Sequence, residues 1–238
     1  NDIWVFRMTK TGLVYANTYN KAYGGTGDDQ SRGVMQTGDA GYIVVGYTDS
    51  YGAGGKDGWI LKLAGNLNVS WQKAYGGSGE DIISDVRQTG DGGYIVVGET
   101  DSYGGGYTDV WVMKLSSTGN IQWQKTYGGN SSDRGKHVRL APDGGYFVGG
   151  DTYSFGAATN KANMLLMHLD ANGNPVYTNL GENLTLGQDT TATVTTTTAT
   201  VTDTDPDEGF TQTAANYATT TPTYTTTTTA ATPITHYP

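Results

Sequence analysis

The 238-residue chain contains no cysteine and few basic residues. The absence of cysteine excludes disulfide bonds and thiolate metal sites, and it leaves the redox compartment open. Lysine and arginine together number 14 against 23 aspartates and glutamates, and neither occurs after Lys161. Because phosphate binding needs clustered basic side chains, the net charge of −9 argues against a nucleic-acid partner.

Long apolar runs and helical apolar patterns are also missing. No stretch is long and apolar enough to cross a bilayer, so no membrane span is expected. The 36 glycines instead separate many short β-like runs. The chain begins at Asn1 rather than Met, which is typical of a mature form after removal of a signal segment. We therefore expect a secreted, extracellular or cell-surface protein.

A 52-residue repeat organises the first three quarters of the chain. Tyr42, Tyr94 and Tyr146 align within Gly-Tyr-Ile-Val-Val-Gly or a close variant of it. The second unit has four β-like runs separated by turn-forming Gly, Asp and Asn clusters: Ile83–Gln88, Gly93–Thr100, Asp109–Ser116 and Ile121–Tyr127. A period near 50 residues with four strands per unit is typical of a propeller blade.

The two ends of the repeat region are incomplete. Asp2-Ile-Trp-Val-Phe-Arg-Met8 matches the third run of the second unit, so residues 2–25 form half a blade. Complete blades are expected at 26–77, 78–129 and 130–180, although the third has lost the tryptophans of the first two. Two strands are then missing from the fourth blade. Residues 184–202 are rich in β-branched Thr and Val, and we expect closing strands there.

The predicted fold is therefore all-β: a four-bladed β-propeller over residues 1–203, whose last blade is built from N-terminal and C-terminal strands. Residues 204–238 form a Thr-rich tail, and 24 of the 58 residues from Gly181 to Pro238 are threonine. Such composition is typical of an extended, O-glycosylated stalk. Fully extended, the tail reaches about 110 Å, whereas the domain is about 40 Å across. It is long enough to add strands to neighbouring molecules.

Covalent glycans are expected at two kinds of site. Asn-x-Ser/Thr sequons place N-glycan candidates at Asn68, Asn130 and Asn183, each in or beside a predicted turn. The threonine tracts supply O-glycan candidates, represented by Thr195, Thr196, Thr197, Thr198, Thr225, Thr226 and Thr227.

Acidic residues suggest calcium at one segment. Asp203, Asp205, Asp207 and Glu208 resemble the opening of a calcium loop, with oxygen ligands at every second position. The glycine of that loop falls one position late, so an acidic solvated linker is the alternative reading. The aspartates that recur once per blade, such as Asp39 and Asp91, are explained by turn capping, with a ring of calcium sites as the alternative. No other cofactor is expected.

Catalysis has little support in the sequence. The three histidines lie far apart, and no Ser/His/Asp order is present. A catalytic carboxylate pair would break the repeat, whereas the acidic residues here follow it. We expect no enzyme. Recurrent aromatics are interpreted as packing residues, while Tyr51, Tyr103 and Phe155 in the Gly-rich connections offer an aromatic rim for a sugar.

The repeat resembles a propeller-type family found in secreted and surface proteins of bacteria and archaea. The resemblance rests on Trp71-Gln-Lys-Ala-Tyr-Gly-Gly77, Asp91-Gly-Gly-Tyr-Ile-Val-Val-Gly98 and Asp109-Val-Trp-Val-Met-Lys-Leu115. It covers residues 2–180 and implies the fold and a surface location, but it transfers no catalytic residues. The Thr-rich tail lies outside it.

Two functions remain. The first is a glycosylated structural protein that assembles with other copies of itself into a filament or surface layer through its tail, because a head-to-tail contact that does not close gives an open assembly. The second is a carbohydrate-binding or adhesive module of the cell surface, with the tail as its stalk. A filament subunit should bury its tail against other copies. A lectin should show blade-repeated pockets and accessible aromatic rings.

Overall fold

A computed structural model describes residues 1–8, 10–12, 20–155, 161–176, 193–196 and 200–203. All regular structure in these ranges is β-strand, arranged in antiparallel sheets. Within the same ranges there is no helix with the length and hydropathy needed to cross a membrane. The predicted all-β class is confirmed.

The strands form four sheets that follow the repeat. The half blade pairs β1 (Ile3–Phe6) with β2 (Asn20–Tyr23). The first blade holds β3 (Asp29–Gln36), β4 (Tyr42–Thr48), β5 (Asp57–Leu63) and β6 (Val69–Gly76). The second blade holds β7 (Asp81–Gln88), β8 (Tyr94–Thr100), β9 (Asp109–Leu115) and β10 (Ile121–Gly128). The third holds β11 (Asp133–Leu140), β12 (Tyr146–Thr152) and β13 (Asn163–Leu169).

The strand boundaries in the second blade agree with the predicted runs to within two residues. Glycines inside β4 and β8 allow the neighbouring strand to approach closely. A Cβ on Gly46 or Gly98 would lie 1.9 Å from the carbonyl oxygen of Gln30 or Ile82 on the neighbouring strand. The chain can pass that close only where a side chain is absent. The β7–β8 ladder shifts register between Ile83 and Asp85, directly after the position that faces Gly98.

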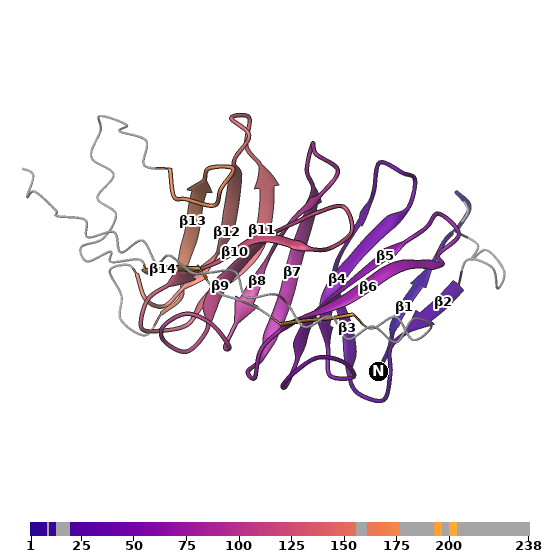
Figure 1. The fold of residues 1–238 in the computed structure, drawn as a ribbon, viewed down its shortest axis with the longest axis horizontal. Helices are drawn as coiled ribbons and strands as arrows, with labels where there is room; N and C mark the ends of the chain where they lie inside the picture. The colour runs from indigo at the N-terminus through magenta and orange to yellow at the C-terminus, as the bar shows by residue number, and fades with distance from the viewer. Residues whose placement is uncertain (9, 13–19, 156–160, 177–192, 197–199, 204–238) are drawn as a thin grey trace, which may run out of the picture.

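The sheets stack face to face in a row, with the core divided between the junctions (Figure 1). At each junction the first strand of a blade lies on the blade before it: β7 contacts β3, β4 and β5, and β11 contacts β7, β8 and β9. Ile43 and Ile60 of the first blade share a buried cluster with Val86 and Trp111 of the second. This stacking is propeller-like, and each junction buries one apolar layer.

The described blades form an open row, and the predicted closing strands lie elsewhere. β14 (Thr193–Thr196) pairs with β10, and β15 (Thr200–Asp203) pairs with β6, so they extend the outer edges of the second and first blades. The structure therefore differs from the prediction that these strands complete the half blade. β1–β2 and β11–β13 lie at opposite ends of the molecule (Figure 1). Strand propensity did not identify the partner, because any free strand edge offers the same main-chain groups.

Candidate functional site

The predicted glycosylation sites are only partly within the described residues. Asn68 is exposed beside the start of β6, and its side chain accepts a hydrogen bond from the Lys21 ammonium group. Asn130 is exposed in the turn between β10 and β11. Thr195 and Thr196 belong to β14, whose side chains are not described. The remaining candidates lie outside the described residues: Asn183, Thr197, Thr198, Thr225, Thr226 and Thr227.

The side chains of the predicted calcium segment also lie outside the described part of the structure. Asp203 ends β15 with its side chain undescribed, and Asp205, Asp207 and Glu208 lie outside the described residues. Among the residues that the structure describes, no group of three or more histidines or acidic side chains is gathered as metal ligands would be.

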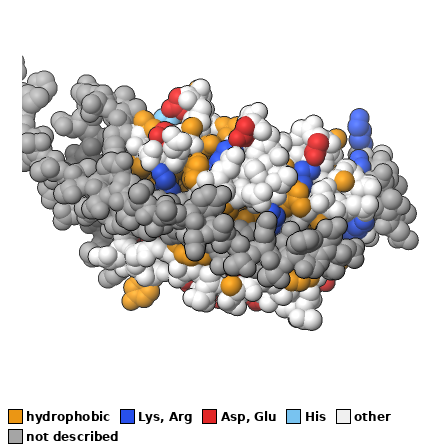
Figure 2. Space-filling view, in the orientation of Figure 1, with side chains coloured by type: hydrophobic (Ala, Val, Ile, Leu, Met, Phe, Trp, Pro, Cys, Tyr) orange, Lys and Arg blue, Asp and Glu red, His pale blue; other side chains and the backbone are white. Residues whose placement is uncertain are grey.

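The blade-periodic turn aspartates act as caps, as predicted. The carboxylate of Asp39 accepts hydrogen bonds from the Gly41 amide at 3.0 Å and from the Lys62 ammonium group at 2.8 Å. Asp91 does the same with Gly93 and Lys114, at 3.0 and 2.8 Å. The lysine in each pair is the main reason why the pKa of the carboxyl group lies well below its usual range. Acidic and basic groups adjoin at several places on the face shown in Figure 2.

A second set of aspartates, one at the start of each blade, accepts several hydrogen bonds. Asp133 accepts hydrogen bonds from the Gly129 amide at 2.8 Å, from the Ser154 hydroxyl at 2.6 Å and from the Thr152 hydroxyl. Asp29 and Asp81 make the equivalent bonds in the first and second blades. These buried carboxylates tie the first strand of each blade to the end of its second strand.

Two further aspartates lie beside that set across the blade junctions. Asp109 and Asp133 approach the same side of Gly128, since a Cβ there would meet both carboxyl groups within 2.8 Å. Burial raises the pKa of Asp109 to about 7, and the neighbouring charge of Asp133 adds to the effect. Burial likewise raises the pKa of Asp57 to about 6, with Asp81 nearby. The junctions therefore contain carboxyl groups that titrate near neutral pH.

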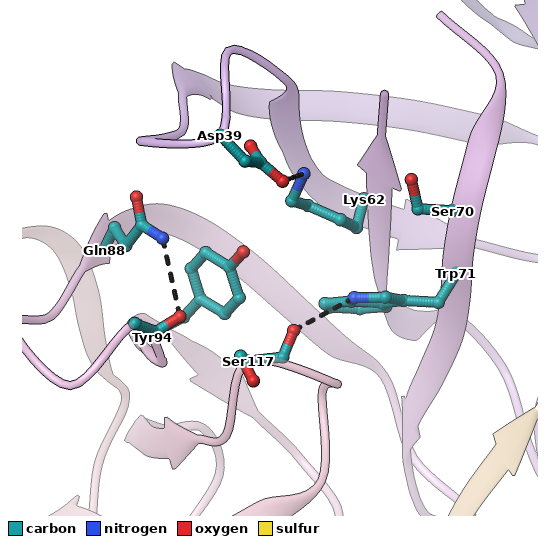
Figure 3. Close-up of a pocket in the computed structure, with 8 residues that line it drawn as sticks. Asp39, Lys62, Ser70, Trp71, Gln88, Tyr94 and Ser117 are labelled. Atoms are coloured by element: carbon teal, nitrogen blue, oxygen red, sulfur yellow. Dashed lines mark hydrogen bonds and ion pairs between the residues drawn. The ribbon is translucent and has the colours of Figure 1, made fainter. Parts of the chain in front are cut away.

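A pocket of about 370 Å³ opens between the first and second blades (Figure 3). The indole of Trp71 and the ring of Tyr94 lie on one side of it, with centroids 6.1 Å apart and planes at 64°. The Asp39–Lys62 ion pair forms the other side. The lining residues are Asp39, Lys62, Ser70, Trp71, Gln88, Gly92, Tyr94 and Ser117. One aromatic face beside charged hydrogen-bonding groups suits a polar ring-shaped ligand.

The same arrangement of side chains recurs at the next junction. Trp123 lies 6.1 Å from Tyr146, and its indole N–H donates to the carbonyl of Ala171 at 3.2 Å, as that of Trp71 donates to Ser117. The Lys114–Asp91 ion pair repeats the Lys62–Asp39 pair. The interpretation of these tryptophans as packing residues is confirmed, because Trp71 and Trp123 pack against the buried clusters of the two junctions. Their part in lining a pocket was not predicted, and its available signal was their position in the first half of β6 and β10, where other residues are exposed.

The predicted aromatic rim faces inward. The Tyr51 ring packs against Trp59 with centroids 5.7 Å apart, and its hydroxyl donates to the Gly24 carbonyl at 3.0 Å. Tyr103 repeats these contacts with Trp111 and Gly76. Phe155, the third member, is also partly buried. Tyr51 and Tyr103 pack against the buried clusters of the junctions, whereas Trp71 and Tyr94 are the aromatic residues that line the pocket.

The two ends of the row expose apolar side chains. At the third blade these are Phe147, Met164 and Leu166, which are 38%, 88% and 69% exposed. At the half blade they are Trp4, Phe6 and Met8. A contiguous apolar surface of this kind is typical of a contact surface.

Comparison with known proteins adds no assignment. No protein-family model matches the chain, and no curated protein sequence matches it. The candidate functional regions therefore rest on their own geometry: the Trp71/Tyr94 pocket with its repeat at Trp123, and the two apolar ends.

Proposed function

We propose that the protein is a structural, extracellular subunit that assembles with copies of itself into a filament or surface layer. The observation that carries the proposal is the exposed apolar face of the third blade, with Phe147, Met164 and Leu166. In the first two blades the equivalent face is buried by the next blade. A protein that keeps large apolar residues on such a face has a use for them in association.

The proposed assembled form is a four-bladed repeat in which the half blade β1–β2 counts as part of the fourth blade. The resemblance to secreted propeller-type repeats supports an extracellular location, where Asn68 and Asn130 would carry glycans. The Thr-rich tail, residues 204–238, is proposed to strengthen contacts between copies by adding strands to free sheet edges.

Electron microscopy of the full chain beside a version truncated after Asp203 tests this function. We expect fibres or sheets from the full chain, and shorter or fewer assemblies after truncation. Single particles from both proteins at every concentration would overturn the structural role. Equal assembly of both proteins would support self-association and show that the tail does not contribute to it.

Carbohydrate binding is the second candidate, and the repeated aromatic sites favour it. Trp71 and Trp123 each offer an indole face next to a lysine–aspartate pair, and sugars bind by stacking on aromatic rings with hydrogen bonds to charged groups. Binding to a panel of immobilised glycans tests it. We expect Trp71→Ala together with Trp123→Ala to abolish binding, and Tyr107→Ala, a loop aromatic outside the pocket, to leave it unchanged. If the unmodified protein binds none of the glycans on the panel, carbohydrate binding is ruled out as the function.

A further inference from the structure

The exposed face of the third blade continues an interface that the molecule already uses twice. Strand register makes Phe147 equivalent to Ile43 and Ile95, because they pair with His168, Lys62 and Lys114 at the same place in β13, β5 and β9. Ile43 and Ile95 are fully buried under the next blade, while Phe147 is 38% exposed.

The same comparison holds along the third strand of the blade. Leu166 is equivalent to Ile60 and Val112, which are fully buried. Met164 is equivalent to Gly58 and Val110, yet it is 88% exposed. Each of these three apolar side chains is at least as large as its buried counterparts. The third blade has therefore kept the surface that normally receives a following blade.

The half blade presents the opposite surface. Trp4 pairs with Ala22 as Trp59 pairs with Ala74, so the two tryptophans are equivalent. Trp59 is 1% exposed and Trp4 is 59% exposed. Phe6 and Met8 follow at the positions of Leu61 and Leu63, both fully buried. This face is the one that a blade turns toward the blade before it.

Existing junctions show how such faces fit. At the junction of the first and second blades, Ile60 lies in one buried cluster with Trp111 and Met113. Their equivalents at the ends of the row are Leu166 on the third blade and Trp4 and Phe6 on the half blade. The two surfaces are thus complementary in position as well as in chemistry.

We propose that the half blade of one copy docks on the open face of the third blade of a second copy, with Trp4, Phe6 and Met8 packed against Phe147, Met164 and Leu166. The row of blades then continues from chain to chain. The contact is heterologous, because each copy uses a different surface, and its repetition gives an open filament. A second copy is the occupant because the two surfaces lie at opposite ends of one molecule (Figure 1).

This inference rests on the proposed self-assembly and names the contact that produces it. Paired charge variants of the full chain test it. Leu166→Glu and Phe6→Lys each place a charge in the contact, and we expect each to raise the concentration needed for assembly roughly 100-fold or more. Both positions are partly or largely exposed in the single chain, so folding should persist, as circular dichroism would show.

Mixing the two variants separates contacts between copies from contacts within one. When the variants alternate along a filament, every second contact joins two unmodified faces, and the remaining contacts pair the two opposite charges. We therefore expect an equimolar mixture to assemble, read by sedimentation and electron microscopy, at a concentration at which neither variant assembles alone. Tyr107→Glu is the matched control: Tyr107 is 77% exposed on the loop between β8 and β9, and its change should leave assembly as it was.

The other outcomes are distinct. Assembly by Leu166→Glu at the concentration that suffices for the unmodified chain would overturn the docking contact and leave the structural function standing. Recovery in a chain carrying both changes, without recovery in the mixture, would place the contact within one copy and overturn docking between copies. Failure of the unmodified chain to assemble at any concentration would overturn the docking and the proposed function together.

Discussion

The second and third blades are built from the same repeat but have different surroundings. The second blade is covered on both faces, and its strand β9 is buried along its whole length. Within the described part of the chain, the third blade is covered only by the blade before it, and Met164 and Leu166 of β13 are exposed. Yet the sequence of β13 remains apolar. Local sequence therefore specifies the strand, while neighbouring blades decide what the strand buries.

The hydrogen bonds of the buried aspartates differ less between the two blades than the apolar faces do. Asp81 and Asp133 make the same hydrogen bonds in the two blades, because their partners lie in the same blade or at the end of the blade before it, and no bond needs a following blade. The residue that faces the following junction does differ, because Asp109 of the second blade is replaced by Asn163 in the third. The carboxyl group is present where a following blade buries it, and an amide stands at the open end.

The largest expected effect contrasts one position in the two blades. Val112→Asp places an unpaired carboxylate in a fully buried cluster, and we expect a loss of about 4 kcal/mol or more in the free energy of unfolding. Leu166→Asp, at the equivalent exposed position, should change it by less than about 0.5 kcal/mol in the monomer. Urea denaturation followed by tryptophan fluorescence compares the two. Equal losses would mean that the third blade is covered in the monomer.

The second prediction concerns what the two blades share. Asp81→Ala and Asp133→Ala each leave buried hydroxyl and amide donors without an acceptor, so each should cost about 2–4 kcal/mol. Exposed Asp101 is the control, and its change to alanine should cost less than about 0.5 kcal/mol. Thermal denaturation of the three variants is the measurement. A much smaller loss of stability for Asp133→Ala than for Asp81→Ala would show that the hydrogen bonds of Asp133 stabilise the third blade less than those of Asp81 stabilise the second.

The third prediction is a pH dependence that only the covered junctions should show. The pKa of Asp109 is raised to about 7 by burial, so above the ordinary pKa of 3.8 the unfolded chain releases a proton that the folded chain retains. Stability therefore falls as pH rises from about 4 to 7, by at most about 1.4 kcal/mol per pH unit for this group. Asp109→Asn should remove that loss, raising stability at pH 8 and leaving it unchanged near pH 4.

Asn163→Asp is the matched variant for the pH experiment, because it places a carboxyl group at the equivalent position of the open blade. We expect it to leave the slope between pH 4 and 8 unchanged in the monomer. Denaturant midpoints measured across this range compare both variants with the unmodified chain. A steeper loss of stability in Asn163→Asp would indicate that this end of the row is buried as the inner junctions are.

The smallest effect is expected from the exposed ion pair across the first junction. Lys56 lies 3.0 Å from Glu80, whose side chain is 55% exposed. Surface pairs of this kind contribute little, so Lys56→Ala should cost less than about 0.5 kcal/mol. Thermal denaturation at low and high salt measures it. A loss of several kcal/mol would show that charge rather than apolar burial holds the blades together.

The sequence predicted the turn aspartates of the candidate site but not its pocket. The repeat identified the turn aspartates Asp39 and Asp91 as caps, since a cap depends on residues two positions away. The interpretation of Trp71 as a packing residue is confirmed, whereas the pocket beside it was not predicted. Its indole lines a pocket together with Tyr94 from the next blade and the backbone of Ser117, and residues so far apart meet only through blade stacking.

The sequence by itself determined the all-β class, the repeat and the strand boundaries, because the spacing of glycines, turn residues and apolar runs acts over a few residues. Tertiary structure alone decided which edges β14 and β15 extend, because main-chain hydrogen bonds are the same along every free edge. It also decided that Trp4 and Leu166 are exposed while Trp59 and Ile60 are buried. Burial depends on whether another blade is present, and a repeated sequence cannot specify its own ends.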